Sequence, residues 1–149
     1  MKVVHSRKVR AVEPLPRLKT LLEMVSDRQF HEWVERISVP RHFQAEQEQN
    51  RATARWLCDV FDSMGFRVER QGRYSNVLAF PQKSFEEMVL VGAHYDSVPM
   101  CPAADDNGSA VAAMLGCAAA CSLWQPVFCR SSLSLSTARR TACWAAATL

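Results

Sequence analysis

Apolar positions recur at helical spacing over the first half of the chain. Positions 30, 33, 34 and 37 share one helical face, and Ser26 precedes them in a helix-capping pattern. Pro40 ends that helix, because the residue before a proline avoids helical geometry. A longer helix is predicted over residues 44–64, where apolar side chains recur at intervals of three and four and Gly65 supplies the stop.

The pattern then changes to strand spacing. Residues 66–70 alternate, residues 76–80 form a second short run, and residues 88–93 form a third, continuously apolar run. This third run is expected to be the most buried strand, and a helix is expected over residues 108–116. Helices followed by strands, and then a strand, a loop and a helix, favour an α/β fold.

Composition allows one domain with its own core. The chain has 149 residues, 48% of them hydrophobic, and a net charge of +3, which is too small to indicate a nucleic-acid partner. The apolar stretch 110–121 is too short to span a bilayer, and no apolar segment follows the basic N-terminus as in a secretory signal. We therefore expect a cytoplasmic protein with no membrane partner. Cys58 is interpreted as a core thiol, and no disulfide framework is expected.

The chain changes character after Asp106. Every acidic residue lies at or before this position, and residues 107–149 contain no Asp, Glu, Lys or His. A solvated helix or strand needs charged groups on its outer face, so this region differs from the rest. The expected organisation is an N-terminal extension over residues 1–25, broken by prolines, a folded region over 26–116, and an aberrant, unfolded tail over 117–149.

Candidate chemistry is concentrated at the end of the third strand. His94 and Asp96 follow it directly, and the acidic cluster Asp105-Asp106-Asn107-Gly108-Ser109 opens the next helix. Residues two apart on a strand point the same way, so Asp96 can accept a proton from the imidazole nitrogen of His94 that faces away from a metal. Adjacent carboxylates repel each other unless a cation lies between them. The pattern therefore indicates the metal site of a hydrolase.

Each of these residues also has a plainer interpretation. A lone histidine after an apolar strand is commonly a core residue bonded to backbone, and carboxylates at the start of a helix commonly act as its N-cap. Asp96 beside His94 weakens the first interpretation, and two adjacent acids are more than one cap requires.

The residues from Val89 to Pro99 and from Ala104 to Ala113 resemble the M28 family of zinc aminopeptidases. Upstream, Pro40-Arg41-His42-Phe43 and parts of residues 65–77 also fit, so the resemblance covers about residues 26–116. It implies a mixed β-sheet flanked by helices, the zinc-exopeptidase and phosphorylase/hydrolase-like architecture.

The same resemblance implies roles for the site residues. His94 would be a terminal zinc ligand, Asp106 the carboxylate that bridges two Zn²⁺ ions, and Asp96 the catalytic-site partner that orients His94. The implied reaction is hydrolytic removal of N-terminal residues from peptide substrates. Ala103 departs from the family, which has a glycine in this turn, so backbone strain is expected there.

The resemblance does not continue into the tail. Family members carry a downstream Glu-Glu pair, a general base and a zinc ligand, and then a further Asp and His, whereas no Asp, Glu or His follows Asp106. Two ligands bind zinc weakly, and hydrolysis without a general base is slow. The chain as given is therefore expected to be incomplete and inactive.

A change of reading frame near residues 115–127 would account for the tail. When the third base of each codon is joined to the first two bases of the next, Cys143-Trp144-Ala145 necessarily reads Leu-Gly. The preceding residues permit Phe-Asn-Gly-Glu-Glu-Asp-Gly in that frame, which resembles the family's strand and Glu-Glu segment. Our hypothesis is that the tail is translated out of frame.

Two alternatives remain open. Glutaminyl cyclases resemble these peptidases but use one zinc ion and a different downstream site, although the Asp-Asp-Asn-Gly-Ser motif favours the peptidase. Alternatively, the chain is a non-catalytic truncated fragment or interaction protein, whose exposed apolar sheet edge would favour association.

Overall fold

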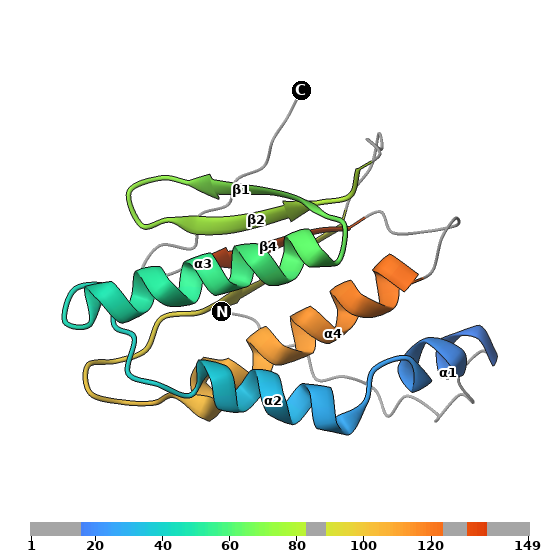
Figure 1. The fold of residues 1–149 in the computed structure, drawn as a ribbon, viewed down its shortest axis with the longest axis horizontal. Coiled ribbons are helices and arrows are strands. Elements are labelled where there is room, and N and C mark those ends of the chain that lie inside the picture. The colour runs from blue at the N-terminus through green and yellow to red at the C-terminus, as the bar shows by residue number, and fades with distance from the viewer. Residues whose placement is uncertain (1–15, 83–88, 124–130, 137–149) are drawn as a thin grey trace, which may run out of the picture.

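The computed structural model of the chain describes residues 16–82, 89–123 and 131–136 (Figure 1). Its helices and strands are α1 (Pro16–Glu23), α2 (Asp27–Ile37), α3 (Gln47–Ser63), β1 (Arg67–Gln71), β2 (Asn76–Phe80), β3 (Val89–His94), α4 (Ser109–Leu123) and β4 (Ser131–Ser136). An irregular helical turn, Ala104–Gly108, joins the loop after β3 to α4.

The described strands form one mixed sheet in the order β1-β2-β4-β3. β1 pairs with β2 and β2 pairs with β4 in antiparallel fashion, whereas β3 and β4 run parallel. Leu135 of β4 lies opposite both Val77 of β2 and Ala93 of β3. The start of β2 and the end of β3 therefore lie at the same end of the sheet. The α/β class and the mixed sheet predicted from the sequence are confirmed.

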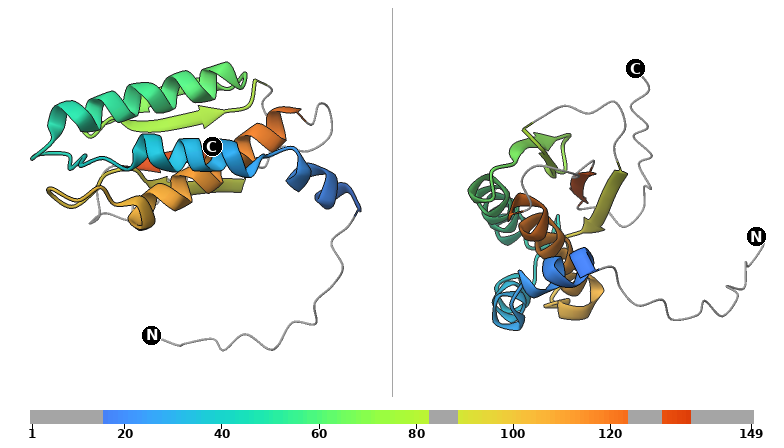
Figure 2. Two further views of the ribbon diagram at one scale, coloured as in Figure 1. Left: turned by 60° about the horizontal axis from the view of Figure 1, so that its bottom comes forward. Right: turned by 90° about the vertical axis from the view of Figure 1, so that its right-hand side faces the viewer.

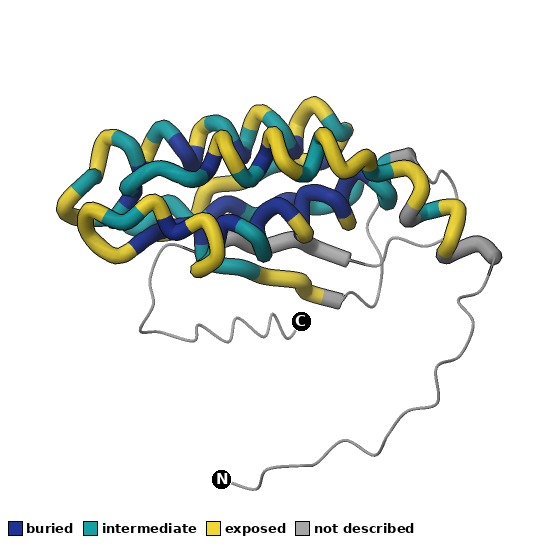
Figure 3. Tube along the Cα trace, turned by 90° about the horizontal axis from the view of Figure 1, so that it is seen from below, coloured by how far each residue is buried: buried dark blue, intermediate teal, exposed yellow. Residues whose placement is uncertain are grey.

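Helices α2, α3 and α4 form a layer on one face of this sheet (Figures 1 and 2). α3 contacts β1 and β2, while α4 contacts β3, β4 and α2. The core between the layers contains fully buried side chains such as Leu57, Phe61, Val77, Val111 and Leu115. Burial of each large apolar side chain contributes about 1.5–3 kcal/mol, so this interface stabilises the fold most. In Figure 3 the buried positions recur along the helices on the sides that face the interior.

Local signals predicted the start of α2 and the end of α3. Ser26 caps α2, and its hydroxyl accepts a hydrogen bond from the backbone N–H of the third helical residue. Gly65 follows α3 with a φ of 84°, the left-handed conformation typical of a helix stop. α3 begins at Gln47 rather than at residue 44, because His42 closes the preceding turn by accepting two backbone N–H groups on its Nδ1.

β3 is not the most buried strand, which corrects the sequence prediction. Leu90 is 54% exposed and Val91 is 38% exposed, although both belong to the apolar run. An apolar run indicates burial on both sides only where helices cover both faces of a sheet. β3 lies at the edge of the described sheet, and the described helices cover one face (Figure 2).

α4 continues past residue 116, where the folded region was expected to end, and stops at Leu123. Ala118 is fully buried and Ala119 is 9% exposed, so this part of the expected tail contributes to the core. β4 also lies within the expected tail and is paired on both sides. A helix needs no charged face where neighbours surround it, and α4 is covered by the sheet and by α2. The rest of the tail lies outside the described residues.

The N-terminal extension expected over residues 1–25 is described only from Pro16. Pro16 does not break regular structure but is the first residue of α1, where proline is tolerated because that N–H has no helical partner. Val25 packs against the core, close to Gly116 of α4. The end of the extension is therefore attached to the folded region.

The cysteines differ in state. Cys58 is half-buried against the core, in agreement with the prediction of a core thiol, and burial raises the pKa of that thiol. Cys101 and Cys117 are also free. Cys121 is disulfide-bonded, a bond that the sequence did not predict.

Candidate metal centre

The end of β3 places the imidazole of His94 between two carboxylates. Its Nδ1 lies 3.1 Å from Oδ1 of Asp96, and its Nε2 lies 3.0 Å from Oδ1 of Asp106. The structure thus brings together the three residues that the sequence singled out. β3 and the loop after it supply two of them, and the turn before α4 supplies the third.

The three side chains form a gradient from the interior to the solvent. The side chain of Asp96 is 3% exposed, that of His94 is 22% exposed and that of Asp106 is 61% exposed. Asp96 is therefore the fixed, buried end of the row, and Asp106 is the end that a metal ion or a substrate can reach.

The two contacts of His94 depend on which of its ring nitrogens carry a proton. A neutral imidazole carries one N–H, and the other ring nitrogen is an acceptor. Asp96 and Asp106 are both acceptors when ionised, so a neutral ring can satisfy only one of them by donation. If Nδ1–H donates to Asp96, Nε2 is an acceptor that faces the acceptor oxygen of Asp106. A second proton on the ring, or a cation bound by both atoms, removes this repulsion. A metal ion ligated by Nε2 and by the Asp106 carboxylate is such a cation.

Asp106 lies in the irregular turn before α4 rather than in a regular helix. Its backbone angles are non-helical (φ −112°, ψ 84°), and the peptide bond to Asn107 is cis. The carboxylate of Asp106 contacts the imidazole of His94, which favours the metal-site interpretation of the acidic cluster over the helix-cap interpretation.

The turn begins at a residue in the left-handed conformation. Ala103 has φ 48° and ψ 51°, at the position where the sequence comparison with the family led us to expect strain. An alanine in this region costs about 1–2 kcal/mol because its Cβ crowds the following carbonyl oxygen. The carbonyl of Ala103 accepts a hydrogen bond from the N–H of Gly108 at 3.1 Å, which closes the turn.

Sequence reasoning missed the buried Arg41, which lies directly beneath this loop. Its side chain is fully buried, and its backbone carbonyl accepts a hydrogen bond from Nδ2 of Asn50 at 2.9 Å. Burial lowers the pKa of the Arg41 guanidinium, and the charge of Asp96 opposes that shift. The signal in the sequence was the arginine of Pro40-Arg41-His42-Phe43, a segment that fits the family resemblance but carries no expected role.

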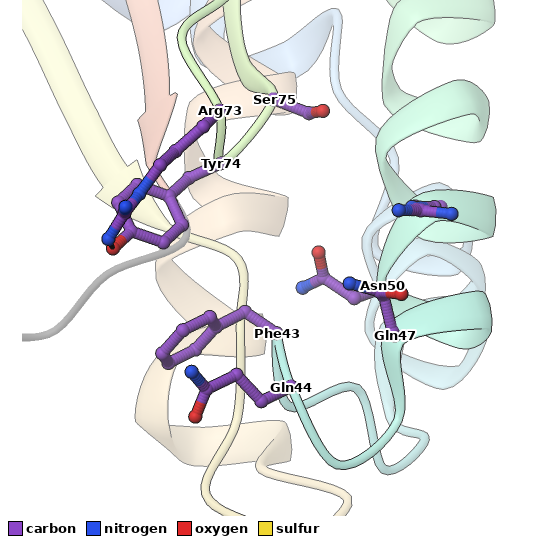
Figure 4. A pocket seen from close by; sticks show the side chains of 8 residues that line it. Phe43, Gln44, Gln47, Asn50, Arg73, Tyr74 and Ser75 are labelled. Atoms are coloured by element: carbon purple, nitrogen blue, oxygen red, sulfur yellow. Dashed lines mark hydrogen bonds between the residues drawn. The ribbon is translucent and has the colours of Figure 1, made fainter.

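A polar pocket lies at the same end of the sheet (Figure 4). Its volume is about 300 Å³, and it lies between the segment that leads into α3 and the β1–β2 turn. Its lining contains no carboxylate and consists of Phe43, Gln44, Gln47, Asn50, Arg51, Arg73, Tyr74 and Ser75. The hydroxyl of Tyr95, between His94 and Asp96, donates to the carbonyl of Ser75 at 3.2 Å and so joins the pocket wall to the site loop.

The donor atoms fit zinc by type but not by number. Imidazole nitrogen and carboxylate oxygen are common zinc donors, and structural or catalytic zinc ions take three or four protein ligands. Within the described ranges, no group of three His, Cys, Asp or Glu side chains is placed to hold a metal ion. His94 and Asp106 therefore supply two donors of the kinds that zinc takes, fewer than the three or four protein ligands of a zinc site.

Residues 76–133 match the family model described as peptidase family M28. The match covers less than half of the chain, and the matched residues are called the M28 segment below. The M28 segment contains β2, β3, α4 and all three site residues. It also extends beyond residue 116, so the resemblance noted from the sequence ended too early.

A curated relative is considerably longer than this chain. The uncharacterized protein YfbL of Escherichia coli K12 is 35% identical over 77 aligned residues, which cover 42% of this chain and 24% of that protein. The chain therefore matches about a quarter of the length of this curated relative.

Solved structures share the fold. The LapA aminopeptidase of Legionella pneumophila has a TM-score of 0.68 at 15% identity, over 89% of this chain and 39% of that one. A glutaminyl cyclase of Porphyromonas gingivalis has a TM-score of 0.65 at 21% identity, over 76% of this chain and 46% of that one. At these identities the likeness shows the fold alone, and this chain spans less than half of each structure.

Proposed function

We propose that this chain derives from a zinc-dependent M28 aminopeptidase that removes N-terminal residues from peptides, and that the chain as given is inactive. The observation that supports the proposal is the row Asp96–His94–Asp106. In it the imidazole of His94 lies between the buried carboxylate of Asp96 and the exposed carboxylate of Asp106. Two Zn²⁺ ions in an intact site would act as Lewis acids on the scissile carbonyl of the substrate.

The residues of the row have distinct roles in this proposal. His94 would hold a metal ion through Nε2, and the carboxylate of Asp106 would serve as a ligand shared between the two ions. Asp96 holds Nδ1–H of the imidazole, which fixes the tautomer and increases the basicity of Nε2 toward a metal.

Inactivity follows from the residues after Asp106. Residues 107–149 contain no Asp, Glu or His, so they supply neither a carboxylate base nor a further ligand of these types. The frame-change hypothesis assigns the missing Glu-Glu pair to the codons around Arg139-Arg140. Sequencing the gene across codons 114–149 tests it: the shifted frame must encode Glu-Glu followed by the Leu-Gly pair, and any other residues at the Glu-Glu positions overturn the hypothesis.

Activity is tested with the present chain and a frame-restored protein side by side. We expect the present chain to bind zinc weakly through His94 and to leave a leucine anilide intact. The frame-restored protein should bind two zinc ions per chain and hydrolyse that substrate. Hydrolysis by the present chain that survives His94→Ala would overturn the proposed site.

Glutaminyl cyclase is the second candidate, because several structural neighbours are glutaminyl cyclases at 20–21% identity. The frame-restored protein distinguishes the two activities. Ammonia release from a peptide with N-terminal glutamine, without hydrolysis of leucine anilide, would favour the cyclase. If the present chain binds no zinc and aggregates, the result would favour the non-catalytic fragment.

Cytoplasmic location and peptide partners also belong to this proposal. None of the described helices is long and apolar enough to cross a membrane. The net charge of +3 supports no nucleic-acid partner. Fractionation of cells that express the tagged chain would test the location.

A further inference from the structure

The side chain of Arg41 donates hydrogen bonds to two backbone segments that lie more than 50 residues after it, at Tyr95 and at Pro102-Ala103. Its Nε donates to the carbonyl of Tyr95, and its two terminal nitrogens donate to the carbonyls of Pro102 and Ala103. A further N–H of the same guanidinium reaches the carbonyl of Val39 at 3.0 Å. One buried side chain therefore contacts both ends of the loop that links β3 to the turn before α4.

The carbonyls that Arg41 holds are next to the site residues. Tyr95 lies between His94 and Asp96 in the chain, and Ala103 opens the turn that carries Asp106. The backbone N–H of Arg41 also donates to Oγ of Ser97 at 2.9 Å, which fixes the residue after Asp96. Arg41 therefore contacts the backbone beside His94 and Asp96 as well as the start of the turn that carries Asp106.

We propose that Arg41 is the positioning residue of the candidate metal centre: by holding the carbonyls of Tyr95 and Ala103 together, it sets the approach of His94 to Asp106. This inference rests on the function proposed above. Arg41 itself lies behind the loop and acts through the backbone rather than as a ligand or a base.

Only arginine can make this set of contacts. The guanidinium carries five N–H donors in a rigid plane, and Arg41 directs four of them at four different carbonyls. A lysine ammonium has three donors on a flexible stem, so Arg41→Lys keeps the charge near Asp96 but leaves buried carbonyls without partners. Arg41→Lys therefore tests the effect of the guanidinium hydrogen bonds separately from the effect of the positive charge.

A core variant supplies the control for lost stability. Phe61 is fully buried near the end of α3 and packs against Phe66. It lies eleven residues beyond Asn50, about 16 Å along the helix at 1.5 Å per residue, so Phe61→Leu weakens the core away from the loop. Urea midpoints of Arg41→Lys, Arg41→Ala and Phe61→Leu establish how much stability each variant loses.

The test uses the full chain with Co²⁺ as the probe and amide NMR as the readout. Arg41→Lys should weaken Co²⁺ binding at His94 and Asp106 by about tenfold or more, the range expected when support behind a ligand is lost. It should also move the metal-free amide signals of residues 95–108. Phe61→Leu should leave both properties unchanged. Ethylguanidinium should restore Co²⁺ binding to Arg41→Ala but have no effect on Phe61→Leu.

Two outcomes would overturn the positioning role. The first is an Arg41→Lys variant with wild-type loop signals and wild-type Co²⁺ affinity. The second is a Phe61→Leu variant that loses as much Co²⁺ affinity as Arg41→Lys at equal stability. Failure of the wild-type chain to bind Co²⁺ counts against the proposed zinc function alone. In that case the metal-free amide signals of residues 95–108 still test the positioning role: a shift in Arg41→Lys supports it, and unchanged signals overturn it. If Arg41→Ala does not fold, the comparison of Arg41→Lys with Phe61→Leu is the test.

Discussion

The imidazole Nε2 of His94 lies 3.0 Å from Oδ1 of Asp106, while Nδ1 of the same ring lies 3.1 Å from Asp96. The contact to Asp106 joins the end of a strand to the turn before the next helix. Because Asp96 is buried and Asp106 is exposed, Nδ1 of the ring faces the protein interior and Nε2 faces the solvent side.

His94→Ala and Asp106→Ala should abolish hydrolysis of a leucine anilide by the frame-restored protein, because each removes a proposed metal ligand. Asp96→Asn should leave both ligands in place but lower zinc affinity about 10–100-fold. Metal analysis after dialysis, together with kcat and KM, measures these effects. Asp105→Asn is the matched control, since it changes an exposed neighbour in the same turn. A loss with Asp105→Asn equal to that with Asp106→Ala would contradict the assignment of Asp106 as the ligand.

Gly108→Ala should destabilise the fold by about 1–3 kcal/mol through overpacking. A Cβ at Gly108 would lie 3.0 Å from Cγ2 of Ile37 and 3.1 Å from the carbonyl oxygen of Ala103, both within the packed turn. Gly116→Ala is the control in α4, where the added Cβ meets Val25 at 3.5 Å, an ordinary contact. It should stabilise the helix by up to about 1 kcal/mol. Urea unfolding followed by tryptophan fluorescence measures both, and equal changes would refute the tight packing at Gly108.

Ala103→Gly should stabilise the chain by up to about 1 kcal/mol, because glycine adopts the left-handed region without the Cβ clash. The loss of a buried methyl group offsets part of this gain. Ala104→Gly, at the exposed next residue, should destabilise it slightly instead, since glycine loses more conformational entropy on folding. Thermal unfolding of the two variants should therefore shift Tm in opposite directions. A lower Tm for Ala103→Gly would argue against strain at this position.

Ala118→Glu should strongly destabilise the chain, whereas Cys117→Glu should change its stability by less than about 0.5 kcal/mol. Ala118 is fully buried against the core and Cys117 is exposed, although they are adjacent in α4. Urea unfolding distinguishes this expectation from the one based on the sequence, in which residues 117–149 have no fold. Similar behaviour of the two variants would support the unfolded tail.

The sequence predicted what depends on nearby residues. Ser26 and Gly65 mark helix ends because their effect is local: one caps the next turn, and the other adopts a positive φ. The pairing of His94 with Asp96 was also predictable, since residues two apart on an extended chain point the same way. The strain at Ala103 followed from its place in a turn where glycine is usual.

The role of Arg41 could not be predicted in this way. An arginine in a loop is ordinarily exposed, because burial of a charge is costly unless hydrogen bonds satisfy it. Three of the four carbonyls that accept from the Arg41 guanidinium belong to residues 54 to 62 positions away, and their approach depends on the packing of α2 and α4 against each other. The charge-poor composition of α4 was misleading for a similar reason, since its neighbours, rather than its own residues, remove it from water.

The sequence by itself therefore determined the α/β class, the start of α2, the end of α3 and the three residues proposed for the candidate site. Only the tertiary structure decided that β3 lies at an exposed edge, that α4 extends to Leu123, and that Asp106 meets His94. The physical reason is the range of the interactions. Caps, turns and strand alternation act over a few residues, whereas burial and the closure of a site depend on segments that only the packed fold brings together.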